Sequence, residues 1–144
     1  MTHADLYEFL NSHRWAVQAS VNPDHGPQAA LVGFAVTPEL EPVFDTLDTT
    51  RKVLNLRENQ KIGFVIGGWL DRDERTVQYE GIADFPTGEA LERLKEVYFA
   101  KFPEGREGLA WQGLIYVRTR PSWIRYSNFN NAPPEINEFS FPSA

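Results

Sequence analysis

The stretch FDTLDTTRKVLNLREN, residues 44–59, decides how the rest of the chain is interpreted. Its pattern predicts a short strand that leads into a helix, and the first turn of that helix carries two cations, Arg51 and Lys52. A helix N-terminus has about half a positive charge and four unpaired N–H groups, so each basic residue there is disfavoured by about 0.3 to 1 kcal/mol. The arrangement points to a negatively charged partner, whose source the stretch leaves open.

Two explanations fit this helix end. In the first, free N–H groups, threonine hydroxyls and the two cations converge on a bound anion, which is the composition of a phosphate site. In the second, Asp48 or Thr49 caps the helix, while the two cations point into solvent or pair with Asp45 and Asp48. The local sequence leaves both explanations open.

The composition is typical of one folded domain. The 144 residues are 42% hydrophobic and 24% charged, which is enough to bury one core, and no apolar run reaches the roughly 18 to 20 residues of a membrane span. The first residues lack the basic and apolar segments of a secretory signal, which favours a cytoplasmic location. With 20 acids against 14 bases the net charge is −6, so we expect neither nucleic acid nor membrane as a partner. The absence of cysteine excludes disulfides and thiolate chemistry.

Alternating apolar residues predict a mainly β domain with a few helices and six to eight short strands. In the first strand every second residue from Trp15 to Val21 is apolar, and in a later strand Gly81 interrupts the pattern, which is typical of a bulge or bend. Strands joined mostly as hairpins favour a small antiparallel barrel over a parallel sheet. The predicted strands cover 14–21, 28–36, 42–47, 61–70, 75–85, 113–119 and 122–129.

Residues that can cap helices, together with a proline at a predicted turn, complete the predicted order of elements. Thr2 is a possible N-cap of the first helix, and Thr87 can cap the longest one. Pro121 predicts a turn between the last two strands, and a tail from about residue 130 is expected to lie over the surface or a neighbouring subunit. The predicted helices cover 2–12, about 50–58 and about 88–101.

Several common kinds of site find no support. His3, His13 and His25 form no i,i+4 pair, so we expect no metal site. No serine lies in a G-x-S-x-G elbow, and the acids that occur close together fall in a turn or on a helix face, where solvated surface charge is the simpler explanation. The glycine motifs of Rossmann and P-loop nucleotide sites are absent as well.

The order of elements over about residues 5–128 resembles the pyridoxamine 5′-phosphate oxidase-like family, the FMN-binding split barrels. The most specific match is to the family pattern T-x-x-x-S-R-K-x-x-x-L-x-x-N. The resemblance implies a six-stranded antiparallel split β-barrel with flanking helices, as one FMN-binding domain over 1–144, and a homodimer with the cofactor at the subunit interface. The residues that match the pattern are Thr46, Thr50, Arg51, Lys52, Leu56 and Asn59.

The resemblance also implies roles for individual residues. Thr46, Thr50, Arg51 and Lys52 would hold the FMN phosphate, and the strand segment 30–32 would run along the isoalloxazine ring. One threonine of the fifth strand stands where many members carry a glutamine that reaches the flavin, and aromatic and basic residues near the C-terminus, Trp111 among them, would act across the interface. The residues expected at the cofactor are Ala30, Leu31, Val32, Asp45, Thr46, Thr50, Arg51, Lys52, Thr76, Trp123 and Arg125.

Departures from the family pattern limit the predicted activity. The oxidase proper has basic residues where this chain has Ala30 and Ala35, and its C-terminal Arg-His-Asp-Arg type segment is missing here. We therefore expect FMN binding and redox chemistry on a small organic molecule, but not vitamin B6 oxidation. No catalytic residue is assigned, although Arg125 is the candidate for a residue near the reactive flavin ring. The alternatives are a non-catalytic module for flavin, deazaflavin (F420) or haem, and an empty barrel used for protein contacts.

Overall fold

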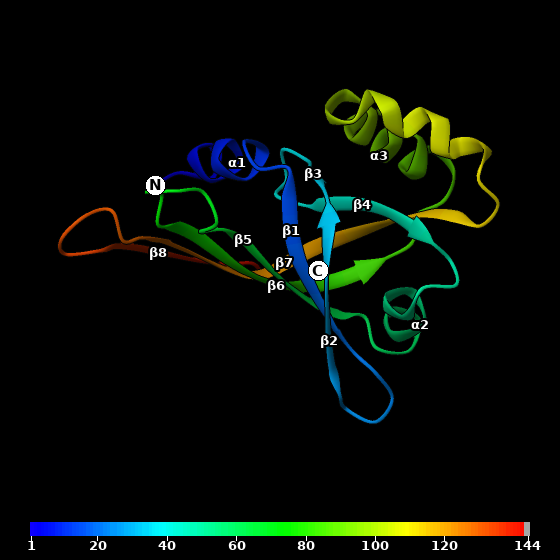
Figure 1. Ribbon diagram of the computed structural model, residues 1–144, viewed down its shortest axis with the longest axis horizontal. Helices are drawn as coiled ribbons and strands as arrows, with labels where there is room; N and C mark the ends of the chain where they lie inside the picture. The colour runs from blue at the N-terminus through cyan, green and yellow to red at the C-terminus, as the bar shows by residue number, and fades with distance from the viewer. Residues whose placement is uncertain (143–144) are drawn as a thin grey trace.

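The computed structural model describes residues 1–142 and contains one antiparallel β-sheet with helices at its two ends (Figure 1). These elements confirm the predicted mainly β composition with a few helices. The strands are β1 (Trp15–Val21), β2 (Pro27–Gly33), β3 (Ala35–Val36), β4 (Pro42–Leu47), β5 (Lys61–Gly67), β6 (Arg75–Asp84), β7 (Leu114–Asn128) and β8 (Glu135–Ser140). The helices are α1 (His3–Asn11), α2 (Arg51–Glu58), α3 (Gly88–Lys101) and the 3-10 helix η1 (Pro103–Ala110).

The sheet curls into a split barrel whose strands follow the order β2-β1-β5-β6-β7-β4-β3, with β8 paired to β7. Every pair of neighbouring strands is antiparallel. Only Phe34 separates β2 from β3, so the two ends of this strand order are joined through the chain. The predicted antiparallel split barrel is confirmed, although the sheet has eight strands rather than six.

One long strand, β7, replaces the two strands and the turn that were predicted around Pro121. Pro121 lies opposite Gly81, and the register between β6 and β7 shifts between Glu80 and Gly81, which marks a β-bulge. A bulge tolerates proline because the missing N–H needs no ladder partner there. A Cβ at Gly81 would collide with the carbonyl oxygen of Arg120, so the bulge also requires glycine. The predicted turn is therefore wrong, whereas the predicted irregularity at Gly81 is confirmed.

The tail from residue 130 contains a strand, β8, that the sequence did not predict. It pairs with residues 123–128 of β7, on the edge that β4 occupies only along residues 114–118. Phe139 of this strand is partly buried against the core. The tail thus extends the sheet, because a free strand edge offers unpaired N–H and C=O groups to any extended segment.

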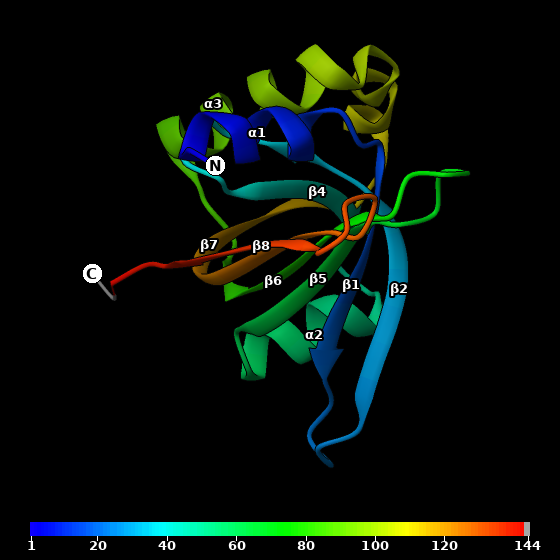
Figure 2. The ribbon, with the colours of Figure 1, turned by 90° about the vertical axis from the view of Figure 1, so that its left-hand side faces the viewer.

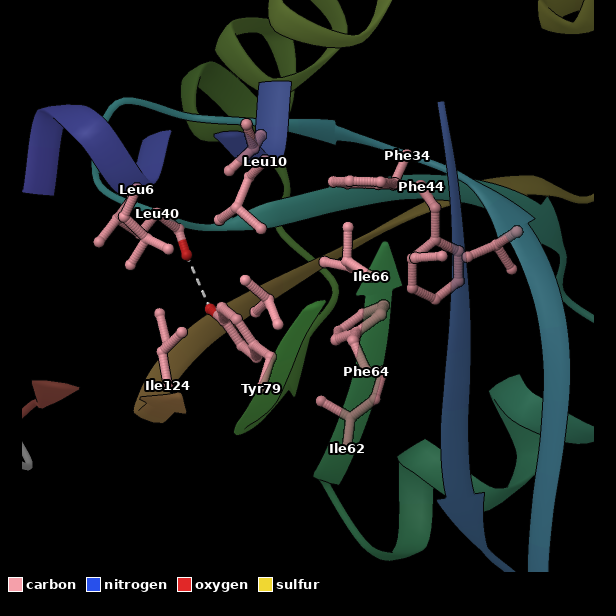
Figure 3. Close-up of a cluster of buried hydrophobic side chains, with 14 of the residues drawn as sticks. Leu6, Leu10, Phe34, Leu40, Phe44, Ile62, Phe64, Ile66, Tyr79 and Ile124 are labelled. Atoms are coloured by element: carbon pink, nitrogen blue, oxygen red, sulfur yellow. Dashed lines mark hydrogen bonds between the residues drawn. The ribbon is translucent and has the colours of Figure 1, made fainter. Parts of the chain in front are cut away.

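The core fills the inside of the curled sheet beneath α1 (Figure 3). Leu6 and Leu10 of α1 point down onto side chains of the sheet, among them Phe64 and Tyr79. The Tyr79 hydroxyl is buried and donates a hydrogen bond to the carbonyl oxygen of Leu40 over 2.8 Å (dashed line in Figure 3). Each large apolar side chain buried in this way contributes about 1.5 to 3 kcal/mol, so the core holds the barrel in its curled shape.

The three α-helices match their predicted positions closely. Figure 2 shows α1 and α3 together at one end of the barrel and α2 at the other end, beside the β1–β2 hairpin. A second apolar cluster, which includes Tyr98 and Phe99, packs α3 onto β3, β4 and β7. Among residues 1–142, none of the helices combines the length and the apolar character that crossing a membrane requires.

Candidate functional site

The start of α2 is built by the end of β4 and a short turn. Thr46 lies near the end of β4, and Thr50 is the N-cap residue of α2, with φ −71° and ψ 154°. The two threonine hydroxyls lie 3.1 Å apart, and the Thr50 hydroxyl donates to the carbonyl oxygen of Leu47 over 3.1 Å. These contacts fix the turn so that Arg51 and Lys52 enter the helix in its first turn.

No side chain of the described residues caps this helix. The Thr50 side chain makes no cap hydrogen bond, and the first turn holds no acid. The first intrahelical bond runs from the Leu54 N–H to the Thr50 carbonyl oxygen over 3.2 Å, so the preceding N–H groups of the first turn have no partner within the helix. None of the six ion pairs of the described residues involves Arg51 or Lys52. A cap from Asp48 or Thr49 and ion pairs with Asp45 and Asp48 are therefore wrong, whereas Arg51 is exposed, as the solvent-facing form of that explanation expects.

A polar cavity of about 200 Å³ lies beside the two cations. Arg51 and Lys52 form one wall, and the β1–β2 hairpin forms the other. Burial lowers the pKa of the Lys52 ammonium below its usual value, and the charge of Arg51 lowers it further. The wall thus holds two positive charges close together without a protein anion between them. The remaining lining residues are Gln18, Ser20, Gln28, Ala29 and Ala30.

Polar side chains at the cavity wall form a hydrogen-bond network with Asn55 of α2. Asn55, one turn after Arg51, is buried and donates through Nδ2 to Ser20 Oγ over 3.1 Å and to Gln28 Oε1 over 2.8 Å. Gln18 is 1% exposed, and its Oε1 has no hydrogen-bond partner among the described residues. Buried amide oxygens without a partner are uncommon, which marks this wall as a place for a further polar group.

The sequence did not predict that Gln18, Ser20, Gln28 and Asn55 would meet. In β1 the apolar residues Trp15 and Val17 face away from the core, whereas the polar residues of the strand face inward. This reverses the usual arrangement of a half-buried strand. The sequence feature that could have indicated this wall is the pair of polar residues Gln18 and Ser20 at alternate positions of β1. Whether their side chains point inward depends on how the sheet curls.

Successive side chains of the predicted flavin-facing segment 30–32 point to opposite faces of β2. Ala30 lines the cavity, Leu31 is 61% exposed on the opposite side, and Val32 belongs to the core. Ala35 is buried in the cluster below α3, so a base at that position would not reach the cavity from within this chain. Of the three predicted side chains, only that of Ala30 lies at the cavity beside Arg51.

Asp45 is separated from the threonines and cations that follow it. Its side chain accepts a hydrogen bond from the Tyr98 hydroxyl over 3.0 Å, on the side of β4 that faces α3. Thr46, the next residue along the strand, points to the other face. Burial raises the pKa of Asp45, although the bond from Tyr98 opposes that shift. The structure thus gives Asp45 a packing partner away from the cavity.

Thr76, Trp123 and Arg125 lie on the outer face of the sheet. Arg125 pairs across the strands with Gln78 and with Glu138, and its Nε lies 3.8 Å from the Glu138 carboxylate. None of these three residues lines the cavity beside Arg51 and Lys52.

The same outer face is rich in exposed apolar residues. Leu31, Val17 and Val65 are cross-strand neighbours in one row, and Leu31 and Val65 are 61% and 46% exposed. Trp15, at 43% exposure, lies on the same side of β1 as Val17. A row of large apolar side chains on an open sheet face is typical of an interaction surface.

Comparisons with known proteins agree with this fold. Residues 2–127 match the family model described as pyridoxamine 5′-phosphate oxidase. A conserved hypothetical protein from Mycobacterium tuberculosis is 23% identical, with a TM-score of 0.76 over 100% of this chain and 94% of that one. No curated protein sequence matches this chain.

Two other similar structures belong to proteins described as cofactor-binding. A heme binding protein from Mycobacterium smegmatis has a TM-score of 0.81 at 14% identity, over 97% of this chain but only 58% of that one. A pyridoxamine 5′-phosphate oxidase-related, FMN binding protein from Nostoc punctiforme PCC 73102 has a TM-score of 0.66 at 10% identity, over 98% of this chain and 93% of that one. Because the family model covers most of the sequence, this chain belongs to the pyridoxamine 5′-phosphate oxidase family.

Proposed function

We propose that the protein binds FMN and that the phosphate of the cofactor occupies the cavity at the start of α2. The observation that supports this most is a helix end that, within residues 1–142, has no side-chain cap and carries two cations without ion-pair partners, beside a polar wall that includes the buried Gln18 and Ser20. A phosphate dianion at this place would accept hydrogen bonds from free N–H groups of the first turn and from Arg51 and Lys52. It would also remove the unfavourable charge arrangement that the sequence shows.

The protein supplies position and charge, and the flavin supplies the redox chemistry when it is bound. Thr46 and Thr50 would add hydroxyl contacts if the Thr50 hydroxyl turned from Leu47 toward the phosphate. The unpartnered Gln18 Oε1 is an acceptor, so it would suit a hydroxyl of the cofactor rather than its phosphate. We propose a small organic molecule as the substrate.

A second copy of the chain is part of this proposal. Trp123 and Arg125 do not line the cavity beside Arg51, and we propose that they reach the cofactor from another subunit. The exposed row of Leu31 and Val65 on the outer face is a suitable surface for that subunit. The variant Leu31→Glu with Val65→Glu should shift a dimer toward monomer in light scattering. Leu54→Glu, which alters an equally exposed leucine on α2, should leave the mass unchanged.

The FMN site is tested by titration of the purified protein with FMN, followed by flavin fluorescence and calorimetry. Charged hydrogen bonds contribute about 1.5 to 3 kcal/mol each, so the double variant Arg51→Met, Lys52→Met should bind at least about 100-fold more weakly. The matched control Lys61→Met, Arg93→Met removes one exposed lysine and one exposed arginine elsewhere and should bind like the unaltered protein. Equal affinity of the two double variants would place the phosphate elsewhere.

The alternative cofactors give distinct results in the same experiment. The likeness to a heme binding protein concerns the fold, and no histidine lines the cavity beside Arg51. The ring of His13 is buried and its Nδ1 lies 2.9 Å from the Phe9 carbonyl oxygen, so that nitrogen is already engaged. Deazaflavin F420 would use the same phosphate contacts and must be titrated beside FMN. Reduction of the bound flavin by a physiological donor, followed by its reoxidation by small acceptors, would separate an enzyme from a carrier.

A further inference from the structure

A second cavity, of about 420 Å³, lies between the last turn of α2, the start of α3 and the first residues of β7. In Figure 1 these three elements surround the right-hand end of the barrel. Its volume falls in the range of roughly 300 to 1,000 Å³ that small-molecule sites occupy. The lining residues are Arg57, Phe85, Pro86, Thr87, Leu91, Lys95, Leu109, Leu114, Ile115 and Tyr116.

The cavity is separate from the proposed phosphate site. It shares no lining residue with the cavity beside Arg51 and Lys52. Arg57 lies six positions after Arg51 on α2, which places the two residues about 9 Å apart along the helix axis. The two cavities therefore lie at opposite ends of the same helix.

The walls of this second cavity combine apolar side chains with two cations. Most of the lining is aliphatic or aromatic, and no carboxylate is among the ten lining residues. The Arg57 guanidinium lies 4.7 Å from the centroid of the Phe85 ring, which holds it against the wall. The Lys95 ammonium lies 5.9 Å from the centroid of Tyr116 and 3.5 Å from Glu92, whose side chain is 71% exposed.

The two cations differ in whether a carboxylate of the protein pairs with them. Within residues 1–142, Arg57 forms no ion pair, and Lys95 has only the weak surface pair with Glu92. The Tyr116 hydroxyl is buried without a hydrogen-bond partner among the same residues. Thr87 adds a hydroxyl at the rim, because it precedes the first turn of α3 and its side chain makes no cap hydrogen bond.

We propose that this cavity binds a small molecule with an apolar body and a single carboxylate. The apolar walls would remove the body of the molecule from water. The planar guanidinium of Arg57 matches the geometry of a carboxylate, and Lys95 adds a second positive charge. This cavity is separate from the proposed phosphate site. Its ligand is therefore a substrate or effector that binds apart from the flavin phosphate.

The proposal is tested on the full chain by NMR, with 4-phenylbutyrate as the probe and 4-phenylbutyramide as its uncharged match. The carboxylate should give saturable amide shifts at residues around the cavity, with a dissociation constant below about 1 mM. The amide should bind at least about tenfold more weakly, because it cannot form charged hydrogen bonds with Arg57 and Lys95. Similar affinities of acid and amide, or shifts confined to other surfaces, would overturn the proposal.

Variants make the test independent of the flavin. The pair Arg57→Met, Lys95→Met should lower affinity for the carboxylate at least about tenfold, whereas Lys61→Met, Arg93→Met should not change it. Leu91→Trp should fill the cavity and abolish binding of the probe, with the melting temperature as a check that the chain still folds. FMN affinity should be unchanged in Arg57→Met, Lys95→Met. Full retention of carboxylate affinity in that double variant would contradict the site even if FMN binds as proposed.

Discussion

The starts of α1 and α2 have nearly the same backbone and opposite chemistry. Thr2 and Thr50 are both extended N-cap residues, with φ −91° and ψ 169° against φ −71° and ψ 154°. Thr2 Oγ1 accepts the Asp5 N–H over 3.1 Å, and Asp5 Oδ2 accepts the Thr2 N–H over 2.8 Å, which completes a capping box. Thr50 instead bonds backward to Leu47.

This difference separates a helix end that is complete from one that is open. At α1 the chain supplies both the acceptor and the negative charge, as stability alone would favour. At α2 the chain supplies two cations and leaves the N–H groups without a side-chain partner. The second arrangement costs stability in the free protein, which is consistent with our proposal that an anion binds there.

Reversal of the charges at α2 should have the largest effect. Arg51→Glu with Lys52→Glu should weaken FMN binding by more than about 3 kcal/mol, since two charged hydrogen bonds are lost. The same change should raise the free energy of unfolding without FMN by about 0.6 to 2 kcal/mol, because acids suit a helix N-terminus. FMN titration and urea unfolding measure the two effects. A loss of stability together with a loss of binding would indicate misfolding rather than a lost site.

Exchange of the two cap threonines should have an intermediate effect. Thr2→Ala should lower the free energy of unfolding by about 1 kcal/mol, because it breaks the capping box. Thr50→Ala should lower the free energy of unfolding less, since the Thr50 side chain makes no cap hydrogen bond. Of the two variants, only Thr50→Ala should weaken FMN binding. Urea unfolding and FMN titration of both variants make the comparison. Equal losses of stability would mean that Thr50 supports α2 as Thr2 supports α1.

The pH dependence of FMN binding should show a smaller effect of the open helix end. The pKa of Lys52 is lowered from its usual 10.5, mainly by burial, so the ammonium loses its proton earlier than an exposed lysine. Affinity for FMN should therefore be highest below that lowered pKa and fall as pH rises through it. Calorimetry from about pH 7 to about pH 10 measures the fall. Lys52→Arg should flatten it, and an unchanged profile would exclude contact between Lys52 and the phosphate.

The closed helix end should respond in the acid range. The backbone N–H of Thr2, and then its hydroxyl, lower the pKa of Asp5 below its usual 3.8. The folded state therefore holds the Asp5 proton less tightly, and this contribution to stability is present above that value and disappears as pH falls through the lowered pKa. Unfolding curves of the protein and of Asp5→Asn should converge in acid. A constant difference between them at all pH values would contradict the capping box.

Much of the fold was predictable because its decisive signals are local. Thr2 and Asp5 mark the start of α1 within four residues, and the bounds of α2 and α3 follow from their apolar spacing. Pro121 misled the prediction because a proline usually breaks a strand, and only its pairing opposite the Gly81 bulge makes it acceptable. The strand β8 has no strong pattern of its own and forms because β7 offers a free edge.

The candidate site was predicted well on one wall, whereas of the facing wall the prediction included Ala30 alone. Arg51 and Lys52 are adjacent in sequence, so their charge conflict with the helix dipole is visible without a structure. The facing wall comes from Gln18 and Gln28, on strands far earlier in the chain, and their inward direction reverses the apolar pattern of β1. No local rule predicts that reversal.

The sequence by itself determined the three α-helices, most of the strands, their antiparallel class and the two cations at the start of α2, because each depends on residues within a few positions of one another. The tertiary structure decided what faces that helix end. Curling of the sheet brings Gln18 and Ser20 beneath α2, turns Asp45 toward α3 and leaves Trp123 and Arg125 on the outer face. These placements depend on strand order and register, which long-range pairing sets and a single stretch of sequence cannot encode.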